Sequence, residues 1–340
     1  MKKNGFYVFL LFLTLGLFSA CERNDDEPQL PKTPISRLYV SFSDLDTSDL
    51  ENPAKHIAVF DPFTAEAFES PDEYSTAVLE GAGIHFDPYA GRVFQGSFSN
   101  QTITHYSVTA QGSIGTGATS FRDSTLLSQR DLAYDHDSKT LYVTDNLAGS
   151  ISVYAQALNR NGQVRANKKF ELGGQPWGLH LQADSSGSRS LFVALAGATR
   201  EVRLLENINA IDSGVVAAEK RITIEGASDL RGLAYSAVLD LLVVTDFGSG
   251  RLYIIENARQ KLTAGGNVTP TRTIAGTQTQ LSGPIDVEID SRPERLHLYV
   301  IDRVARKLLR FNIADNGNQE PAASFDFVDK TPVSIHIDVR

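Results

Sequence analysis

The 340-residue chain contains a single cysteine, Cys21, and therefore cannot form an intrachain disulfide. It also lacks three motifs with well-understood chemistry: a Gly-x-x-x-x-Gly-Lys-Ser/Thr phosphate loop, a Gly-x-Ser-x-Gly nucleophile turn and a His-Glu-x-x-His metal motif. Its apolar run at residues 6–20 is too short for a comfortable membrane span. No short motif therefore indicates an enzyme class, and the function has to be argued from the fold.

The formal net charge is −9, in a chain that is 41% apolar and 21% charged. This composition is ordinary for a globular protein with a buried core. An acidic surface repels phosphate backbones, so we expect no nucleic-acid partner. The same charge disfavours broad electrostatic docking onto anionic lipid.

The first 21 residues are ordered like a lipoprotein signal. Lys2 and Lys3 precede the apolar run, and small residues stand directly before the cysteine in the sequence LFSAC at 17–21. Residues 1–20 resemble a bacterial lipoprotein signal peptide, which implies lipidation of Cys21 and membrane contact through that lipid anchor only. The alternative is a secretory signal with an incidental cysteine.

An acidic stretch, ERNDDE at 22–27, follows the cysteine and is similar to the surface-export signal of lipoproteins in Bacteroidetes-type bacteria. The resemblance implies an outer-membrane lipoprotein of the cell envelope that is exposed at the surface. A solvated spacer is the alternative. Pro28, Pro31 and Pro34 favour an extended chain, so we expect residues 21–35 to form a flexible tether.

A short phrase recurs six times along the rest of the chain. Each copy has a small or acidic residue, an aliphatic residue, a variable residue and another large apolar residue. The copies stand at 83–86, 131–134, 178–181, 232–235, 286–289 and 334–337. Such self-similarity is typical of repeat folds, because one unit cannot bury its own apolar face.

Runs rich in β-branched and aromatic residues, separated by turn formers, follow the phrase. We expect second strands at 140–145, 241–246 and 296–302, third strands at 150–154, 251–255 and 307–311, and edge strands at 169–172, 220–224 and 271–274. Four antiparallel strands per unit, repeated radially, predict an all-β propeller. No segment longer than one turn is expected to be helical.

The two ends of the chain set the number of blades. Residues 37–40 have the pattern of a second strand with no first strand before them, and a spare first strand stands at 334–338. We therefore predict a six-bladed β-propeller over residues 36–340, closed by pairing of the C-terminal strand with the first blade.

Residues 225–330 carry the strongest resemblance to a known repeat family. The segments GNVTPTRTIAG at 266–276 and LSGPID at 281–286 resemble bacterial NHL-type repeats. The resemblance implies a propeller but no single activity, since propellers include both binding modules and enzymes.

The third residue of the phrase is expected to line the central channel, because the first strand of each blade does so in a propeller. Around the ring this position reads His336, His85, Ala133, His180, Ala234 and Glu288. Imidazole and carboxylate groups together suit zinc or another divalent metal, which makes His85, His180, Glu288 and His336 candidate metal ligands. The alternatives are packing between blades and a polar ligand site without metal.

The residue before each phrase is expected at the mouth of the channel. This position reads Ala82, Arg130, Trp177, Arg231, Ile285 and Val333. Two guanidinium groups beside the only tryptophan suit a carboxylate, a phosphate or a sugar face, so Arg130, Trp177 and Arg231 are the candidate ligand-binding residues. In the alternative, the arginines pair with nearby acids such as Asp131 and Asp229, and Trp177 covers a blade seam.

Asp145, Asp246 and Asp302 end the expected second strands. They are predicted to cap turns, with a ring of carboxylates as the alternative.

These features favour a cell-envelope lipoprotein whose non-catalytic propeller binds a protein, peptide or glycan of the envelope or extracellular space. We assign no catalytic residue and expect no cofactor. The alternative is a metal-dependent hydrolase that resembles six-bladed lactonases, with Glu288 matching the acidic side chains with which those enzymes hold a divalent cation. A structural or assembly role is the third reading.

Overall fold

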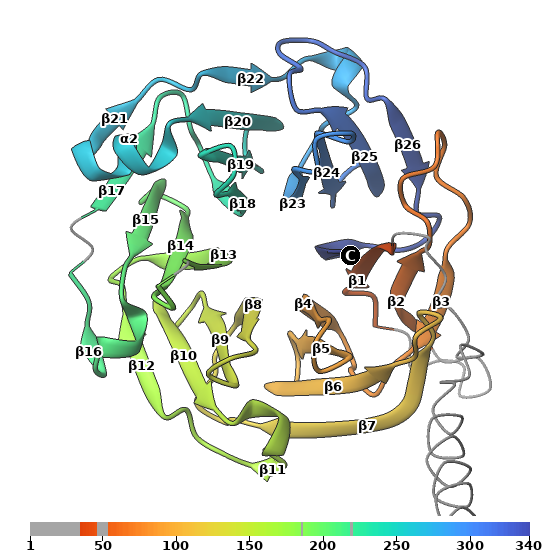
Figure 1. The fold of residues 1–340 in the computed structure, drawn as a ribbon, viewed down its shortest axis with the longest axis vertical. Helices are drawn as coiled ribbons and strands as arrows, with labels where there is room; N and C mark the ends of the chain where they lie inside the picture. Colours follow the sequence, from red (N-terminus) through yellow and green to blue (C-terminus); the bar gives the residue numbers. More distant parts are fainter. Residues whose placement is uncertain (1–34, 46–53, 185, 218–219) are drawn as a thin grey trace, which may run out of the picture. The chain divides into compact units, whose positions relative to one another are not determined.

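The computed structural model describes residues 35–45, 54–184, 186–217 and 220–340. Its strands form six sheets around a central axis, so the fold is an all-β six-bladed propeller, as predicted (Figure 1). The predicted signal peptide, Cys21 and the tether as far as Pro34 lie outside the described residues.

Blades 1 to 3 contain the following strands, given from the channel outward. Blade 1 has β27 (Pro332–Val339), β1 (Ser36–Phe42), β2 (Lys55–Phe60) and β3 (Asp72–Ser75). Blade 2 has β4 (Gly81–Asp87), β5 (Arg92–Ser97), β6 (Thr102–Val108) and β7 (Ile114–Arg122). Blade 3 has β8 (Gln129–Asp135), β9 (Thr140–Asp145), β10 (Ser150–Ala155) and β12 (Lys168–Glu171).

Blades 4 to 6 repeat this arrangement. Blade 4 has β13 (Gln175–Ala183), β14 (Arg189–Ala196), β15 (Glu201–Leu205) and β17 (Lys220–Ile224). Blade 5 has β18 (Leu230–Ser236), β19 (Leu241–Asp246), β20 (Arg251–Glu256) and β22 (Arg272–Ile274). Blade 6 has β23 (Pro284–Asp290), β24 (His297–Asp302), β25 (Lys307–Asn312) and β26 (Ala323–Asp326).

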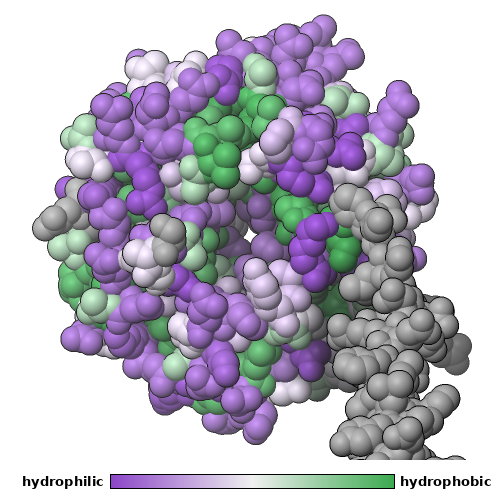
Figure 2. Space-filling view, viewed as in Figure 1, coloured by the Kyte–Doolittle hydropathy of each residue, from purple (hydrophilic) through white to green (hydrophobic). Residues whose placement is uncertain are grey.

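The core of the described part consists of six apolar clusters, one between each pair of neighbouring blades. The second strands β9 and β19 are buried at every position, because each blade packs against a neighbour on both faces. Such strands are continuous apolar runs instead of alternating ones. The face of the propeller seen in Figure 2 is mostly hydrophilic with separate hydrophobic patches.

The ring is closed by β27, which pairs antiparallel with β1 from Ser36 opposite Val339 to Phe42 opposite Pro332. Ile335 on β27 is buried in one cluster with Leu38 of β1. The last strand of the chain therefore completes the first blade, which confirms the predicted closure.

Three sheets have a fifth strand, so the prediction of four strands per blade is incomplete. The added strands are β11 (Gly162–Gln163), β16 (Gly214–Val215) and β21 (Gly266–Val268). Each comes from the segment before the outer strand of the next blade and pairs parallel with the outer strand of the preceding one. Strands of two or three residues are too short to show a period in the sequence.

Helix α2 (Ala258–Ala264) contradicts the expectation that no segment longer than one turn is helical. It buries Ala258 and Leu262 between blades 4 and 5. Short 3₁₀ helices lie at Ala157–Asn159, Ile208–Ala210 and Thr277–Thr279. No helix in the described ranges has the length and apolar character needed to span a membrane.

The first residue of the phrase joins neighbouring blades near the axis. Gly232 on β18 lies so close to β23 that an added Cβ would come 2.4 Å from the Asp286 Cα, which requires glycine there. The Asp286 carboxylate accepts a hydrogen bond from the backbone N–H of Ile335 on β27 (3.0 Å). Asp131 likewise accepts from the N–H of Leu179 on β13 (2.8 Å). The small or acidic residue of the phrase thus serves close packing or bonding between blades.

Candidate functional site

The mouth of the channel is the end at which the innermost strands begin. The second strands run antiparallel to them and end there, so the turns that follow second strands face the same end. Two positions of each blade therefore surround the mouth: the residue before the phrase and the residue after the second strand.

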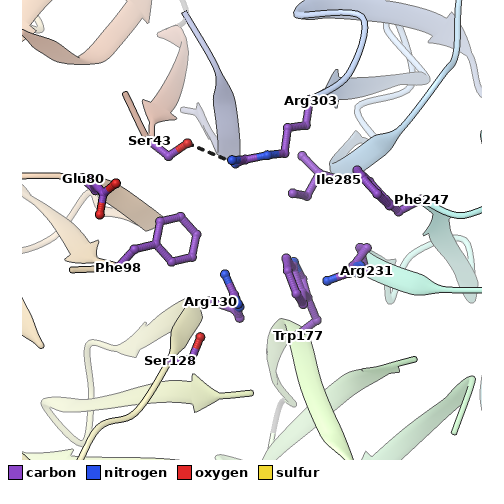
Figure 3. A pocket seen from close by; sticks show the side chains of 10 residues that line it. All are labelled: Ser43, Glu80, Phe98, Ser128, Arg130, Trp177, Arg231, Phe247, Ile285 and Arg303. Carbon is purple, nitrogen blue, oxygen red and sulfur yellow. Dashed lines mark hydrogen bonds between the residues drawn. The ribbon is translucent and has the colours of Figure 1, made fainter. Parts of the chain in front are cut away.

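A cavity of about 430 Å³ opens at this mouth (Figure 3). The structure brings the three candidate ligand-binding residues, Arg130, Trp177 and Arg231, together in it. Its lining consists of Ser43, Glu80, Phe98, Ser128, Arg130, Trp177, Arg231, Phe247, Ile285 and Arg303. The volume lies toward the lower end of the range of about 300–1,000 Å³ that is usual for small-ligand sites.

Trp177 lies between two guanidinium groups (Figure 3). The Cζ of Arg231 is 3.6 Å from the ring centre and that of Arg130 is 4.2 Å from it. Beyond them, Phe98 stacks on Arg130 at 4.8 Å and Phe247 on Arg231 at 5.2 Å. These five side chains alternate ring and cation and form what we call the mouth stack. Stacking uses the guanidinium faces and leaves the in-plane N–H groups free to donate.

The arginines of the mouth differ in their partners. Arg231 donates from Nε to the Asp229 carboxylate at 3.0 Å, as the alternative interpretation predicted. Arg303 donates from Nη1 to the Ser43 hydroxyl at 3.0 Å. Arg130 has neither an ion-pair nor a hydrogen-bond partner among the described residues, and its Nε is buried.

The interpretation in which Arg130 pairs with Asp131 is wrong. Both carboxylate oxygens of Asp131 are occupied by backbone N–H groups, those of Leu132 and Leu179, each at 2.8 Å. Burial, with the nearby charges of Arg231 and Arg303, lowers the pKa of Arg130 to about 10, although the charge of Asp145 opposes this effect. Arg130 is therefore still protonated at neutral pH, and its charge is poorly solvated.

Among the lining residues that sequence reasoning missed are Phe98, Phe247 and Arg303. Each directly follows a second strand, at a position equivalent to Ser43 in blade 1. The backbone N–H at this position bonds back to the loop before the innermost strand, for example from Phe247 to the Asp229 carbonyl at 2.9 Å. The predicted ends of the second strands at 246 and 302 contained the information that locates Phe247 and Arg303.

Asp145, Asp246 and Asp302 act as caps. Asp145 accepts from the N–H groups of Leu127 (2.8 Å) and Ser128 (2.9 Å), which holds the loop that leads to Arg130. Asp246 and Asp302 make the equivalent bonds in blades 5 and 6. These bonds support the prediction of turn caps over that of a carboxylate ring.

The channel beneath the mouth contains a second cavity, of about 140 Å³, lined by His85, His180, Glu288 and His336. The Nδ1 of His336 lies 3.1 Å from Glu288 Oε1, and the rings of His85 and His336 are 4.3 Å apart. Burial, followed by the charges of His336 and His180, holds the pKa of His85 well below its usual value. Burial also lowers the pKa of His180, although Glu288 opposes this effect.

The arrangement of these four side chains does not by itself identify a metal site. The described residues contain no group of three or more His, Cys, Asp or Glu side chains placed to hold one. Glu288 and His336 form an ion pair or hydrogen bond with each other, and the rings of His85 and His336 pack together. The predicted ligands are brought together, but in contacts that also suit packing between blades.

Two aspartates separate the channel from the mouth. Asp131 and Asp286 line the channel cavity, and a small void of about 10 Å³ lies between them and the mouth residues Arg130 and Trp177. Burial raises the pKa of Asp286 to about 7. Burial, with the charge of Asp286, also raises the pKa of Asp131 well above its usual range.

No protein-family model matches the chain, and no curated protein matches it in sequence. Many solved structures share the fold, among them these two. A chain of the nidogen/laminin complex matches with a TM-score of 0.62 and 16% identity, over 89% of this chain and 98% of that one. A Bacteroides fragilis protein named as a candidate 6-phosphogluconolactonase matches with a TM-score of 0.58 and 13% identity, over 92% and 100%. Identities this low show the propeller fold alone, and the resemblance to NHL-type repeats stays a prediction.

Proposed function

We propose that this protein is a non-catalytic binding module whose mouth captures a negatively charged group of its ligand. The observation that carries the proposal is the mouth stack, in which Arg130 is a half-buried cation with no ion-pair partner among the described residues. A carboxylate or phosphate placed in the cavity would accept hydrogen bonds from the guanidinium N–H groups of Arg130. Charge-assisted hydrogen bonds of this kind are among the strongest in proteins.

The stack also argues against a neutral sugar as the main ligand group. A sugar ring binds an aromatic side chain through an open ring face. Arg130 and Arg231 cover both faces of Trp177 (Figure 3). Of the three ligand groups expected for this position, a carboxylate and a phosphate are therefore better supported than a sugar face.

Binding would take place at the cell envelope if Cys21 is lipidated. This part of the proposal is supported by the order of the first 27 residues. A Cys21→Ser variant should lose acyl labelling and leave the membrane fraction. If that variant stays in the membrane fraction, the lipoprotein part of the proposal is wrong, and the proposal that the mouth binds an anion is not affected.

The binding proposal is tested by calorimetric titration of the purified protein with D-galacturonate, glutarate and inorganic phosphate, with D-galactose as the neutral counterpart. We expect at least one anion to bind and D-galactose not to bind. Arg130→Gln should weaken anion binding roughly tenfold or more, the usual effect of losing a charged hydrogen bond. The control is Arg221→Gln, because Arg221 is exposed on the outer strand β17. Equal binding by both variants, or no anion binding at all, would overturn the proposal.

The second candidate function is a metal-dependent hydrolase that uses the channel residues. The contact between Glu288 and His336 beside His85 is the observation in its favour. Elemental analysis of protein purified without a histidine tag tests it. One equivalent of a divalent metal, lost when His85 and His336 are both replaced by alanine, would bring this candidate forward.

A further inference from the structure

Exposed apolar side chains gather at the mouth end of the propeller. The described part exposes ten large apolar side chains, and six of them lie in loops that precede an innermost strand or follow a second strand. The six are Leu45, Leu79, Leu127, Leu147, Val304 and Val328. Three of the other four, Tyr89, Val238 and Leu239, lie in turns at the opposite end, and Val215 lies on the edge strand β16.

These six side chains lie in mouth-end loops of neighbouring blades, and we call them together the apolar arc. They belong to blades 6, 1, 2 and 3 or to the loops that lead into them. Three are direct sequence neighbours of residues that line the cavity: Leu79 of Glu80, Leu127 of Ser128, and Val304 of Arg303. At three places around the mouth, an exposed apolar side chain is thus the direct sequence neighbour of a residue that lines the cavity.

The charges around the cavity limit how acidic a partner can be. Asp229 already offsets Arg231, and Asp44 and Glu80 lie near Arg303. A run of several acidic residues would therefore meet like charge, whereas one carboxylate can reach Arg130, which has no ion-pair partner among the described residues. The centre accepts a single negative charge, and the surroundings accept apolar groups.

We infer that the mouth docks a loop or terminus of another protein that presents one Asp or Glu side chain flanked by apolar residues. The carboxylate enters the cavity and accepts hydrogen bonds from Arg130, while the flanking side chains cover the apolar arc. Exposed apolar patches rimmed by polar residues commonly mark protein-binding surfaces. The inference rests on the proposed capture of an anionic group and adds the class of partner.

A free sugar acid or phosphate would use the cavity but not the arc. This difference allows the partner class to be tested with variants of exposed residues that leave the cavity intact. Leu127 and Leu147 are 59% and 67% exposed, so replacing both with serine removes apolar surface without opening the core. Val238→Ser is the matched control, because Val238 is 84% exposed at the opposite end.

The experiment is selection from a random heptapeptide display library on the immobilised protein, followed by titration of the enriched peptides. We expect enriched sequences to contain one Asp or Glu between aliphatic or aromatic residues. Arg130→Gln should weaken their binding roughly tenfold or more, and Leu127→Ser with Leu147→Ser roughly three- to tenfold. Val238→Ser should leave it unchanged, and the double serine variant should bind glutarate like the wild type.

The possible outcomes separate the two proposals. Enriched peptides without an acidic residue, or binding that the double serine variant does not alter, would overturn the inference about the partner. Binding of D-galacturonate or phosphate that depends on Arg130, without any enriched peptide, would overturn it as well and leave the proposed function standing. If the wild-type protein binds neither an anion nor a peptide, the inference about the partner and the proposed function are both overturned.

Discussion

The guanidinium carbon of Arg231 lies 3.6 Å from the centre of the Trp177 ring, while Nε of the same side chain donates to Asp229 at 3.0 Å. Arg130 stacks on the same ring at 4.2 Å and has no ion-pair partner in the part of the chain that the structure describes. The two arginines share one aromatic partner and differ in charge compensation. This inequality points to Arg130 as the group that meets the charge of a ligand.

The first prediction concerns stability without ligand. Arg130→Met should raise the free energy of unfolding by about 0.5–2 kcal/mol, because it removes a poorly solvated cation and keeps apolar contact with Trp177. Arg231→Met should lower the free energy of unfolding, because Asp229 then loses its ion-pair partner and keeps only the hydrogen bond from the Gly197 N–H. Chemical denaturation of both variants measures the difference. If both variants lose the same amount of unfolding free energy, both arginines mainly stabilise the fold.

The second prediction concerns the close approach of blades 5 and 6. Gly232→Ala places a Cβ 2.4 Å from Asp286 Cα, so the inner strands must separate, at a cost of about 1–3 kcal/mol. Gly117→Ala is the control, since nothing lies within 4 Å of the added atom. The measurement is the melting temperature of each variant. Equal melting temperatures would contradict the close contact between β18 and β23.

The third prediction concerns closure of the ring. Ile335 on β27 is 3% exposed and packs with residues of blades 1 and 6. Ile335→Ala should cost about 2–5 kcal/mol of stability, as for other large-to-small changes in a core. Val328→Ala, at a position 77% exposed, should have little effect. Similar denaturation curves for the two variants would mean that β27 contributes little to the closed ring.

The fourth prediction concerns pH. Burial raises the pKa of Asp286 to about 7, from an ordinary value of 3.8. Between these values the folded protein holds a proton that the unfolded chain releases, so the contribution of Asp286 to stability falls as pH rises from 3.8 to about 7 and is constant above.

Asp286→Asn cannot ionise and should lack this decline. The gap between the melting temperatures of the wild type and the variant should therefore change steadily across that pH window in the direction that disfavours the wild type. A constant gap, or one that moves the opposite way, would show that the hydrogen bonds from Ile335 and Val287 keep the carboxylate charged.

The positions of Arg130, Trp177 and Arg231 could be predicted because the repeated phrase fixes which residue of each blade stands at the mouth. The alternating order of rings and cations in the mouth stack could not be predicted. It depends on Phe98 and Phe247, which lie in turns where no sequence period specifies the direction of a side chain. The sequence also did not show that Arg130 lacks an ion-pair partner among the described residues. Asp131 is its sequence neighbour, and only the structure shows that backbone N–H groups occupy that carboxylate.

Trp177 is the only tryptophan of the chain, so its fluorescence reports on the mouth alone. The most direct test of the central claim is to titrate the protein with an anion that binds it and to follow this emission, in the wild type and in Arg130→Gln. We predict a saturable change in intensity or wavelength in the wild type, at the affinity that calorimetry gives, and a curve shifted roughly tenfold or more in the variant. An emission that stays constant while the anion binds would place the binding site elsewhere and contradict the account.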